Sequence, residues 1–234
     1  MFLANALKLK NSVSSAFSIT DVAGLKAWYK FDTGITLSGS IVTEWADSSG
    51  NTSEDMDLTL HANLTNNICT FDAATKGVVL STDNKSILDT DGDELRLGQF
   101  TIFCVCDVVE SGASNEMLYG RLGNDEFRVY RGSNSLNIRV RANGVNYDID
   151  NTTSTPTGKF LLTVQRKSTG NITMYYNTTE QNNVNSDLAN LFDFTRIGNA
   201  ASDATIFELA VYNTSLTDAN ITSIQNDIMS RTGV

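Results

Sequence analysis

The chain has 234 residues and a formal net charge of −10, because 27 Asp and Glu residues outnumber 17 Lys and Arg residues. A chain of this length can bury a sizeable apolar core in one domain without disulfide or metal cross-links. An acidic chain without a basic cluster binds nucleic acid poorly, since phosphate neutralisation needs Lys and Arg. Its apolar runs are also shorter than the roughly 20 residues of a membrane helix. These properties exclude nucleic-acid binding and membrane insertion.

Residues 1–20 are predicted to form an arm that precedes a single domain at 21–234. The arm has apolar side chains near its start and mostly small polar residues after them. A chain end is usually disordered unless something holds it, so we expect this arm to pack on its own domain or on a neighbouring subunit. It lacks the basic and apolar regions of a secretory signal, which favours synthesis in a cytoplasm. Its candidate partner contacts are Phe2, Leu3, Leu7 and Leu9.

Short β-type segments follow one another along the domain, with polar turns between them. Some are continuous apolar runs, such as 100–109, and others alternate apolar and polar residues, such as 126–131 and 136–141. Because no helical period intervenes, the sequence predicts an all-β antiparallel sandwich of two sheets. Alternating strands should have one wet face, and the continuous runs should lie deeper. The other predicted strands are 25–31, 41–45, 77–80, 145–149, 159–165, 171–176, 196–198 and 205–212.

One helix is predicted near the carboxyl terminus, and it should cover an edge or end of the sandwich. Thr217 is placed as its N-cap, and Asp218 complements the helix dipole. Gly233 is placed as its C-cap. The apolar stripe of this helix consists of Ile221, Ile224 and Ile228.

The cysteines and the single histidine offer little chemistry. Cys104 and Cys106 lie two residues apart, so they share one face of a strand. They could form half of a metal site or be two small buried hydrophobes. The second interpretation is favoured, because no further Cys/His pair completes a tetrahedral zinc site. His61 is not part of any triad-like arrangement and is interpreted as a surface imidazole.

Segments at both ends of the domain carry a family resemblance. Gly24–Asp32 is an apolar-aromatic strand, and Glu44–Asn51 contains a Trp-x-Asp-x-Ser-Gly-Asn turn. Phe194–Asn199 contains Arg-Ile-Gly, and 204–218 combines a Glu-x-x-x-Tyr strand with the start of the helix. Together with the central strand at 100–105, these segments resemble concanavalin A-like lectin/glucanase domains of the laminin G-like type. The resemblance spans about residues 22–232 and implies a jelly-roll sandwich.

Catalysis is not expected. Glycan-cleaving members of this superfamily resemble one another in a strand with paired carboxylates, Glu-x-Asp-x-Glu or a close variant. Retaining hydrolysis needs two carboxyl groups about 5 Å apart, which one strand face supplies. The nearest match here is Glu54–Asp57, which lies beside a turn and has the wrong order. We therefore predict a protein that is not an enzyme.

An acidic loop is a candidate calcium site. Asp89, Asp91 and Asp93 alternate around Gly92, and Glu94 follows. Hard cations take several oxygen ligands, which a bent acidic loop can supply. Some laminin G-like domains bind calcium through loop carboxylates, so the resemblance also implies Ca²⁺ as a cofactor. A solvated acidic loop is the favoured alternative, because the downstream bidentate Glu of an EF-hand is missing.

Aromatic side chains beside Asn- and Asp-rich loops are candidate glycan contacts. Trp28 and Trp45 are expected in the core, because half of the rings on alternating strands must face inward. Tyr175 and Tyr176 are adjacent, so they should point to opposite faces, and one should face outward unless it is covered. The candidate glycan-contacting aromatics are Tyr130, Tyr147, Tyr175 and Tyr176.

Two hypotheses for function remain, because this fold hosts many roles. The first is a non-enzymatic structural or accessory protein of a tailed-phage virion, made in the host cytoplasm. It would decorate the capsid or tail, with the lectin-like sandwich contacting other virion proteins or surface glycans. The alternative is a carbohydrate-binding, lectin-like receptor-recognition module on a fibre or cell surface. A homo-oligomer or a lattice-bound state is expected in either case.

Overall fold

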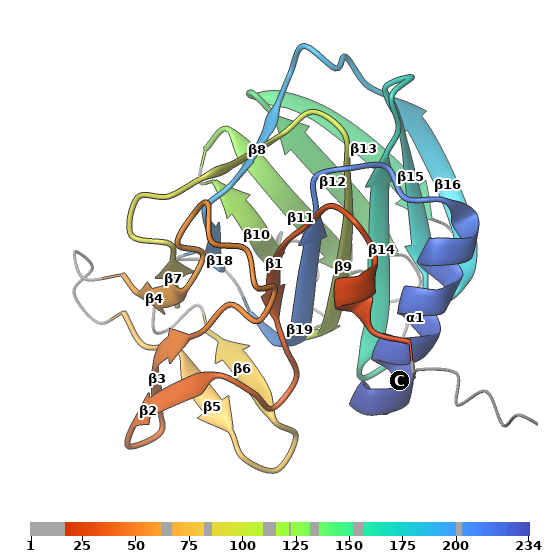
Figure 1. Ribbon diagram of the computed structural model, residues 1–234. Coiled ribbons are helices and arrows are strands. Elements are labelled where there is room, and N and C mark those ends of the chain that lie inside the picture. Colours follow the sequence, from red (N-terminus) through yellow and green to blue (C-terminus); the bar gives the residue numbers. More distant parts are fainter. Residues whose placement is uncertain are drawn as a thin grey trace, which may run out of the picture.

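The computed structural model describes residues 17–61, 67–81, 86–109, 116–121, 123–131, 136–151, 157–199 and 203–234. These residues form an antiparallel β-sandwich with one α-helix and a short 3₁₀ turn, η1 (Ile19–Asp21), which confirms the predicted fold class (Figure 1). The described part contains no helix that is long and apolar enough to span a membrane. The predicted arm contacts Phe2, Leu3, Leu7 and Leu9 lie outside the described residues.

The first sheet is built around a long central strand, β9 (Phe100–Val108). On one side of β9 the sheet continues outward to an edge strand, and on the other side β9 pairs with β19 (Ala204–Tyr212). β19 pairs in turn with β6 (Gly77–Leu80) along its first half and with β1 (Leu25–Tyr29) along its second half. The outward strands are, in order, β14 (Phe160–Arg166), β15 (Asn171–Tyr176) and β16 (Thr179–Asn185).

The second sheet packs against the first, and β5 (Thr70–Asp72) links the two sheets by pairing with both β3 and β6. A separate two-stranded ribbon consists of β8 (Leu95–Leu97) and β17 (Phe192–Phe194). The strands of the second sheet are, in spatial order, β13 (Val145–Asn151), β12 (Leu136–Ala142), β11 (Asp125–Arg131), β10 (Glu116–Arg121), β18 (Arg196–Ile197), β7 (Leu88–Asp89), β4 (Leu58–Leu60), β3 (Ile41–Trp45) and β2 (Ile35–Ser38).

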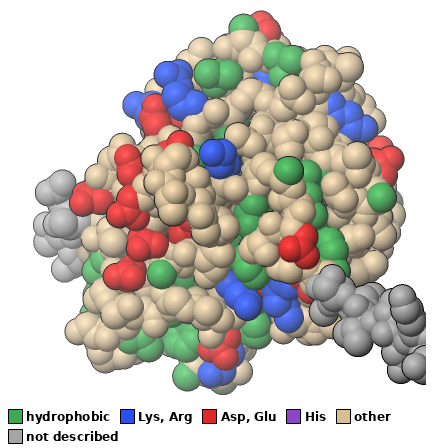
Figure 2. Space-filling model, viewed as in Figure 1, with side chains coloured by type: hydrophobic (Ala, Val, Ile, Leu, Met, Phe, Trp, Pro, Cys, Tyr) green, Lys and Arg blue, Asp and Glu red, His purple; other side chains and the backbone are tan. Residues whose placement is uncertain are grey.

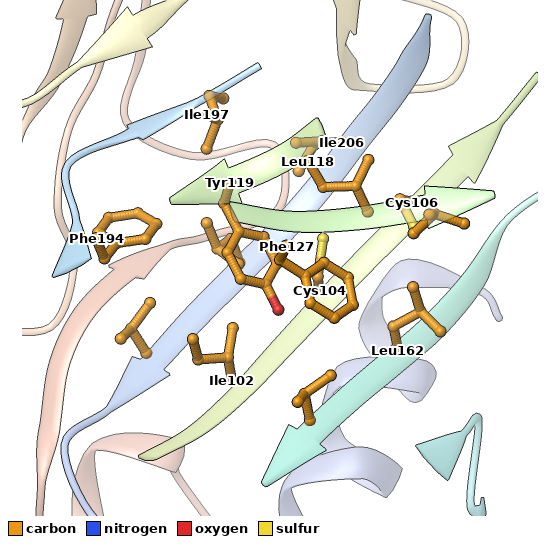
Figure 3. Packing of buried hydrophobic residues seen from close by; sticks show 14 of the residues in the cluster. Ile102, Cys104, Cys106, Leu118, Tyr119, Phe127, Leu162, Phe194, Ile197 and Ile206 are labelled. Carbon is orange, nitrogen blue, oxygen red and sulfur yellow. The ribbon is translucent and has the colours of Figure 1, made fainter. Parts of the chain in front are cut away.

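The core lies between the two sheets. Both faces of β9 are buried, which explains why the sequence of this strand is apolar without alternation. Cys104 and Cys106 point into the space between the sheets, where they meet Leu162 of the neighbouring strand (Figure 3). Phe103 and Val105 point to the opposite face, which is also buried. Both cysteines are free and buried, as the hydrophobe interpretation predicted.

The helix α1 (Asp218–Thr232) accounts for that second buried face. Its caps are as predicted: Thr217 Oγ1 accepts a hydrogen bond from Asn220 N at 3.3 Å, and Gly233 has a left-handed φ of 74°. Its position corrects the prediction, because α1 lies across the outer face of the first sheet rather than at an edge or end (Figure 1). The reason is that this face is apolar and needs a cover. The stripe Ile221, Ile224 and Ile228 packs there with Phe103, Val105, Leu161 and Ala210.

Candidate functional site

A polar cavity of about 410 Å³ lies where four short or terminal pieces of the second sheet come together, at β4, β7, β18 and β10. Its size is in the range of small-molecule sites, roughly 300–1,000 Å³. Apart from one imidazole, its lining has no aromatic ring. The lining residues are His61, Asp89, Thr90, Asp91, Gly92, Glu94, Arg121, Thr195 and Arg196.

Strand register places two of the charged residues in this lining. Asp89 of β7 is the cross-strand neighbour of Arg196 of β18. The next pair along these strands, Leu88 and Ile197, is fully buried in the core. Because side chains alternate along a strand, Asp89 and Arg196 point away from the core and into the cavity.

The histidine belongs to this cavity, which corrects its interpretation as an isolated surface imidazole. His61 follows β4 directly, and its Nδ1 is paired with an Asp89 carboxylate oxygen. Both side chains are largely covered, with exposed fractions of 25% for His61 and 12% for Asp89. The Asp89 carboxylate is therefore engaged by the protein itself.

The predicted calcium loop is a tight turn in which three of the four carboxylates contact other parts of the chain. Asp93 N donates to Thr90 O at 3.3 Å, and Asp91 has a left-handed φ of 53°. Asp93 then accepts a hydrogen bond from Asp55 N at 2.9 Å, and Glu94 lies 3.5 Å from Arg121 Nη1. Across the described residues, no three His, Cys, Asp or Glu side chains gather as metal ligands would. Asp89, Asp91 and Glu94 thus line one cavity while Asp93 does not, and calcium binding stays a prediction.

Arg121 is held at the cavity wall by two carboxylates and by the backbone before it. Its Nη1 donates to Asp193 Oδ2 at 3.2 Å as well as to Glu94. Gly120 has a φ of 128°, and a Cβ there would come within 2.2 Å of Asp125 O, so only glycine fits. Gly120 O also accepts hydrogen bonds from Thr195 N at 3.1 Å and Thr195 Oγ1 at 3.2 Å. These bonds tie β10 to β18 beside Arg196.

Arg196 and Asp91 differ from the rest of the lining because they have no partners. Among the described residues, none accepts a hydrogen bond from the Arg196 guanidinium or forms an ion pair with it, and its Nε is buried without a partner. Asp91 is exposed, and its carboxylate accepts no hydrogen bond within the described chain, although Asp91 N donates to Asp89 Oδ1 at 3.4 Å. The cavity therefore offers an unused cationic donor and an unused anionic acceptor.

A second polar cavity, of about 350 Å³, lies beside the first and includes the Trp-x-Asp-x-Ser-Gly-Asn turn. Asp47 Oδ1 accepts a hydrogen bond from Trp28 N at 2.7 Å, so this turn anchors β1. Asp57 Oδ1 in turn accepts one from Asp47 N at 2.6 Å. Burial, and then the charges of Asp47, Asp57 and Asp55, hold the pKa of Tyr29 well above its usual range. Acidic side chains gather on the side of the molecule where Figure 1 shows β4 and β7 (Figure 2).

The predicted glycan-contacting aromatics do not form an open platform. Tyr175 lies in the cluster under α1 and is 8% exposed. Tyr147 is also 8% exposed, and its hydroxyl accepts hydrogen bonds from the loop that follows β16. Tyr176 is partly buried, with its ring 5.6 Å from that of Phe160. The side chain of Tyr130 lies outside the described part. Trp28 and Trp45 are buried, as predicted.

Sequence reasoning missed the arginines of the cavity. Arg196 was noticed only as part of the Arg-Ile-Gly strand, and Arg121 was not singled out. One signal was present, because Arg196 is a charged residue directly before a buried Ile in a short strand. Such a residue must point out of the core, which makes it a surface or site candidate.

In class, the fold and the cavity define an antiparallel β-sandwich with a charged pocket. No protein-family model and no curated protein sequence matches the chain. Solved structures do resemble it. The binding domain of Paraclostridial Mosquitocidal Protein 1 has a TM-score of 0.59 at 13% identity, over 90% of this chain and 53% of that one.

Two structures of the binding domain of botulinum neurotoxin DC are also similar, each with a TM-score of 0.58. One, in complex with SialylT, is 14% identical and covers 90% of this chain and 52% of that chain. The other, in complex with rat synaptotagmin II, is 15% identical and covers 89% of this chain and 52% of that chain. The chain thus spans about half the length of these structures, and the likeness concerns the fold.

Proposed function

We propose that the protein is a lectin-like binding module that recognises a cell-surface glycan through the cavity at β4, β7, β18 and β10. The observation that carries the proposal is the pair of unused polar groups, Arg196 and Asp91, in a cavity of ligand size. Buried or half-buried polar groups normally have partners, so an unpartnered guanidinium in a concave site favours a ligand.

The similar structures support binding as the general role. Among them are one solved with the glycan SialylT and one solved with the protein receptor synaptotagmin II. Those ligands are known for those proteins, about half of whose length matches this chain. They favour the receptor-recognition hypothesis over a virion role, and attachment to a phage capsid or tail stays a sequence-based prediction.

Two of the three carboxylates in the cavity lining are paired, which favours binding over hydrolysis. Asp89 is paired with His61, and Glu94 with Arg121. A general acid must be free to hand its proton to the substrate, and a nucleophilic carboxylate must be free to attack. Paired carboxylates are better suited to fixed hydrogen bonds, which is what recognition of a sugar needs.

An array of cell-surface glycans probed with the labelled full chain tests this function. We expect binding to at least one glycan class, and its loss in Arg196→Ala. The matched control is Arg139→Ala on β12, whose guanidinium pairs with Asp148 at 2.6 Å, outside the cavity lining. Binding that survives Arg196→Ala, or that is lost equally in both variants, would contradict a site in this cavity.

A further inference from the structure

We infer, building on the proposed function, that the cavity takes a neutral sugar with neighbouring hydroxyl groups rather than an acidic one. A sugar hydroxyl both donates and accepts hydrogen bonds, so a pair of hydroxyls can use one charged donor and one charged acceptor together. Arg196 supplies the donor and Asp91 the acceptor, and both line the same cavity without a partner in the described chain.

The charge of the lining argues against a carboxylate or sulfate. The cavity has three carboxylates, on Asp89, Asp91 and Glu94, against the two guanidinium groups of Arg121 and Arg196. One of those guanidinium groups, on Arg121, is already shared between Glu94 and Asp193. An acidic ligand would gain Arg196 but would lie beside the uncompensated Asp91. The whole chain adds to this repulsion with its net charge of −10.

The lining also predicts weak binding to a single sugar. Sugar rings have an apolar face, and no Trp, Tyr or Phe is among the described residues that line the cavity. Affinity then depends on hydrogen bonds alone, which exchange water for protein partners with a small net gain. Multivalent display compensates for weak single sites, so the ligand should be probed on a polymer that carries many copies.

Asp91→Asn separates the two ligand classes, because it removes a charge while it keeps an oxygen acceptor. For a neutral sugar, the amide introduced by this substitution would form a weaker, uncharged hydrogen bond, and binding should fall. For an acidic sugar, removal of the nearby negative charge should strengthen binding. Neither the Asp91 nor the Arg196 side chain forms a hydrogen bond with the described chain. Variants at these two positions should therefore have the same melting temperature as the wild type.

The experiment uses biolayer interferometry with polyacrylamide polymers that carry mannose, glucose, galactose, sialic acid or sulfated galactose. Wild type should bind at least one neutral polymer more tightly than both acidic ones. Arg196→Gln should weaken that binding by about tenfold or more, the scale of one charge-assisted hydrogen bond. Asp91→Asn should weaken it less, and Arg139→Gln should leave it unchanged.

The outcomes distinguish this inference from the function on which it rests. Binding to the acidic polymers alone, or tighter binding by Asp91→Asn, would overturn the inference and leave glycan recognition standing. Binding to no polymer at all would overturn both. A neutral sugar bound equally by wild type and Arg196→Gln would overturn the inference, because the cavity would not be the site.

Discussion

The helix-covered side of the sandwich and its cavity end differ in how their charged groups are paired. Under α1, the buried Glu208 accepts hydrogen bonds from Trp28 Nε1 at 2.7 Å and from Arg231 Nη2 at 2.6 Å. Four buried side-chain atoms in the described part lack a hydrogen-bond partner: Arg196 Nε in the cavity lining, Asp193 Oδ1 on β17, Tyr119 Oη in the core between the sheets, and Gln165 Oε1 on β14. Asp193 Oδ1 still lies 3.3 Å from Arg96 Nε in an ion pair.

The contrast is between a region that contributes stability and a region that we propose binds a ligand. Unsatisfied buried polar groups cost free energy, so they persist where something other than stability requires them. On the helix-covered side, the charged groups Glu208 and Arg231 pair with each other. The cavity end leaves groups unused, which is consistent with a ligand site built on a rigid sheet.

The largest loss of stability is expected from a substitution that breaks the ion pair on the helix-covered side. Glu208→Ala should lower the free energy of unfolding by about 3–5 kcal/mol, because it leaves the Arg231 guanidinium without its main partner in a covered position. The measurement is urea denaturation followed by tryptophan fluorescence. Glu94→Ala is the matched control at the cavity end, and loss of its exposed ion pairs should cost only about 0–1 kcal/mol. Equal losses would remove the energetic distinction between the two regions.

Part of the fold could be predicted from the sequence and part could not. The strands at 41–45, 77–80 and 171–176 were predicted with their observed bounds, because their patterns and turns are local. The helix caps Thr217 and Gly233 are equally local signals. β16 was missed because its sequence, TEQNNVN, has no apolar alternation, and it is a strand only through its pairing with β15.

The cavity was beyond prediction for a different reason. It combines His61, the turn at 90–94, Arg121 and Arg196, which come together only through strands of two or three residues and one longer neighbour. Such short strands have almost no periodic signal, and their pairing is set by the tertiary fold. The acidic loop was found, but the contacts of its carboxylates with His61, Asp55 and Arg121 were not, because those residues are distant in the sequence.

Substitutions at two tyrosines should change the free energy of unfolding by an intermediate amount, one upward and the other downward. Tyr119→Phe should raise the free energy of unfolding by about 1 kcal/mol, because it removes a buried hydroxyl without a partner while the ring stays stacked on Phe127 at 4.6 Å. Tyr29→Phe should lower it by about 1 kcal/mol, because the Tyr29 hydroxyl donates to Met56 O at 2.6 Å. Thermal and urea unfolding of both variants measure the difference. A loss of stability in Tyr119→Phe would show that its hydroxyl has a partner after all.

The smallest effect isolates the helix that covers the first sheet. Thr217→Ala removes the side chain that accepts a long, exposed hydrogen bond from Asn220 N, and it should cost about 0.5 kcal/mol. Thr222→Ala is its control within the same helix, because Thr222 Oγ1 only donates back to Asp218 O on an exposed turn. Since Ala is the better helix former, that change should be neutral or slightly stabilising. Hydrogen exchange of the α1 amides should rise in Thr217→Ala alone, and the cavity should bind its ligand as before, because the cap touches only the helix-covered side of the sandwich.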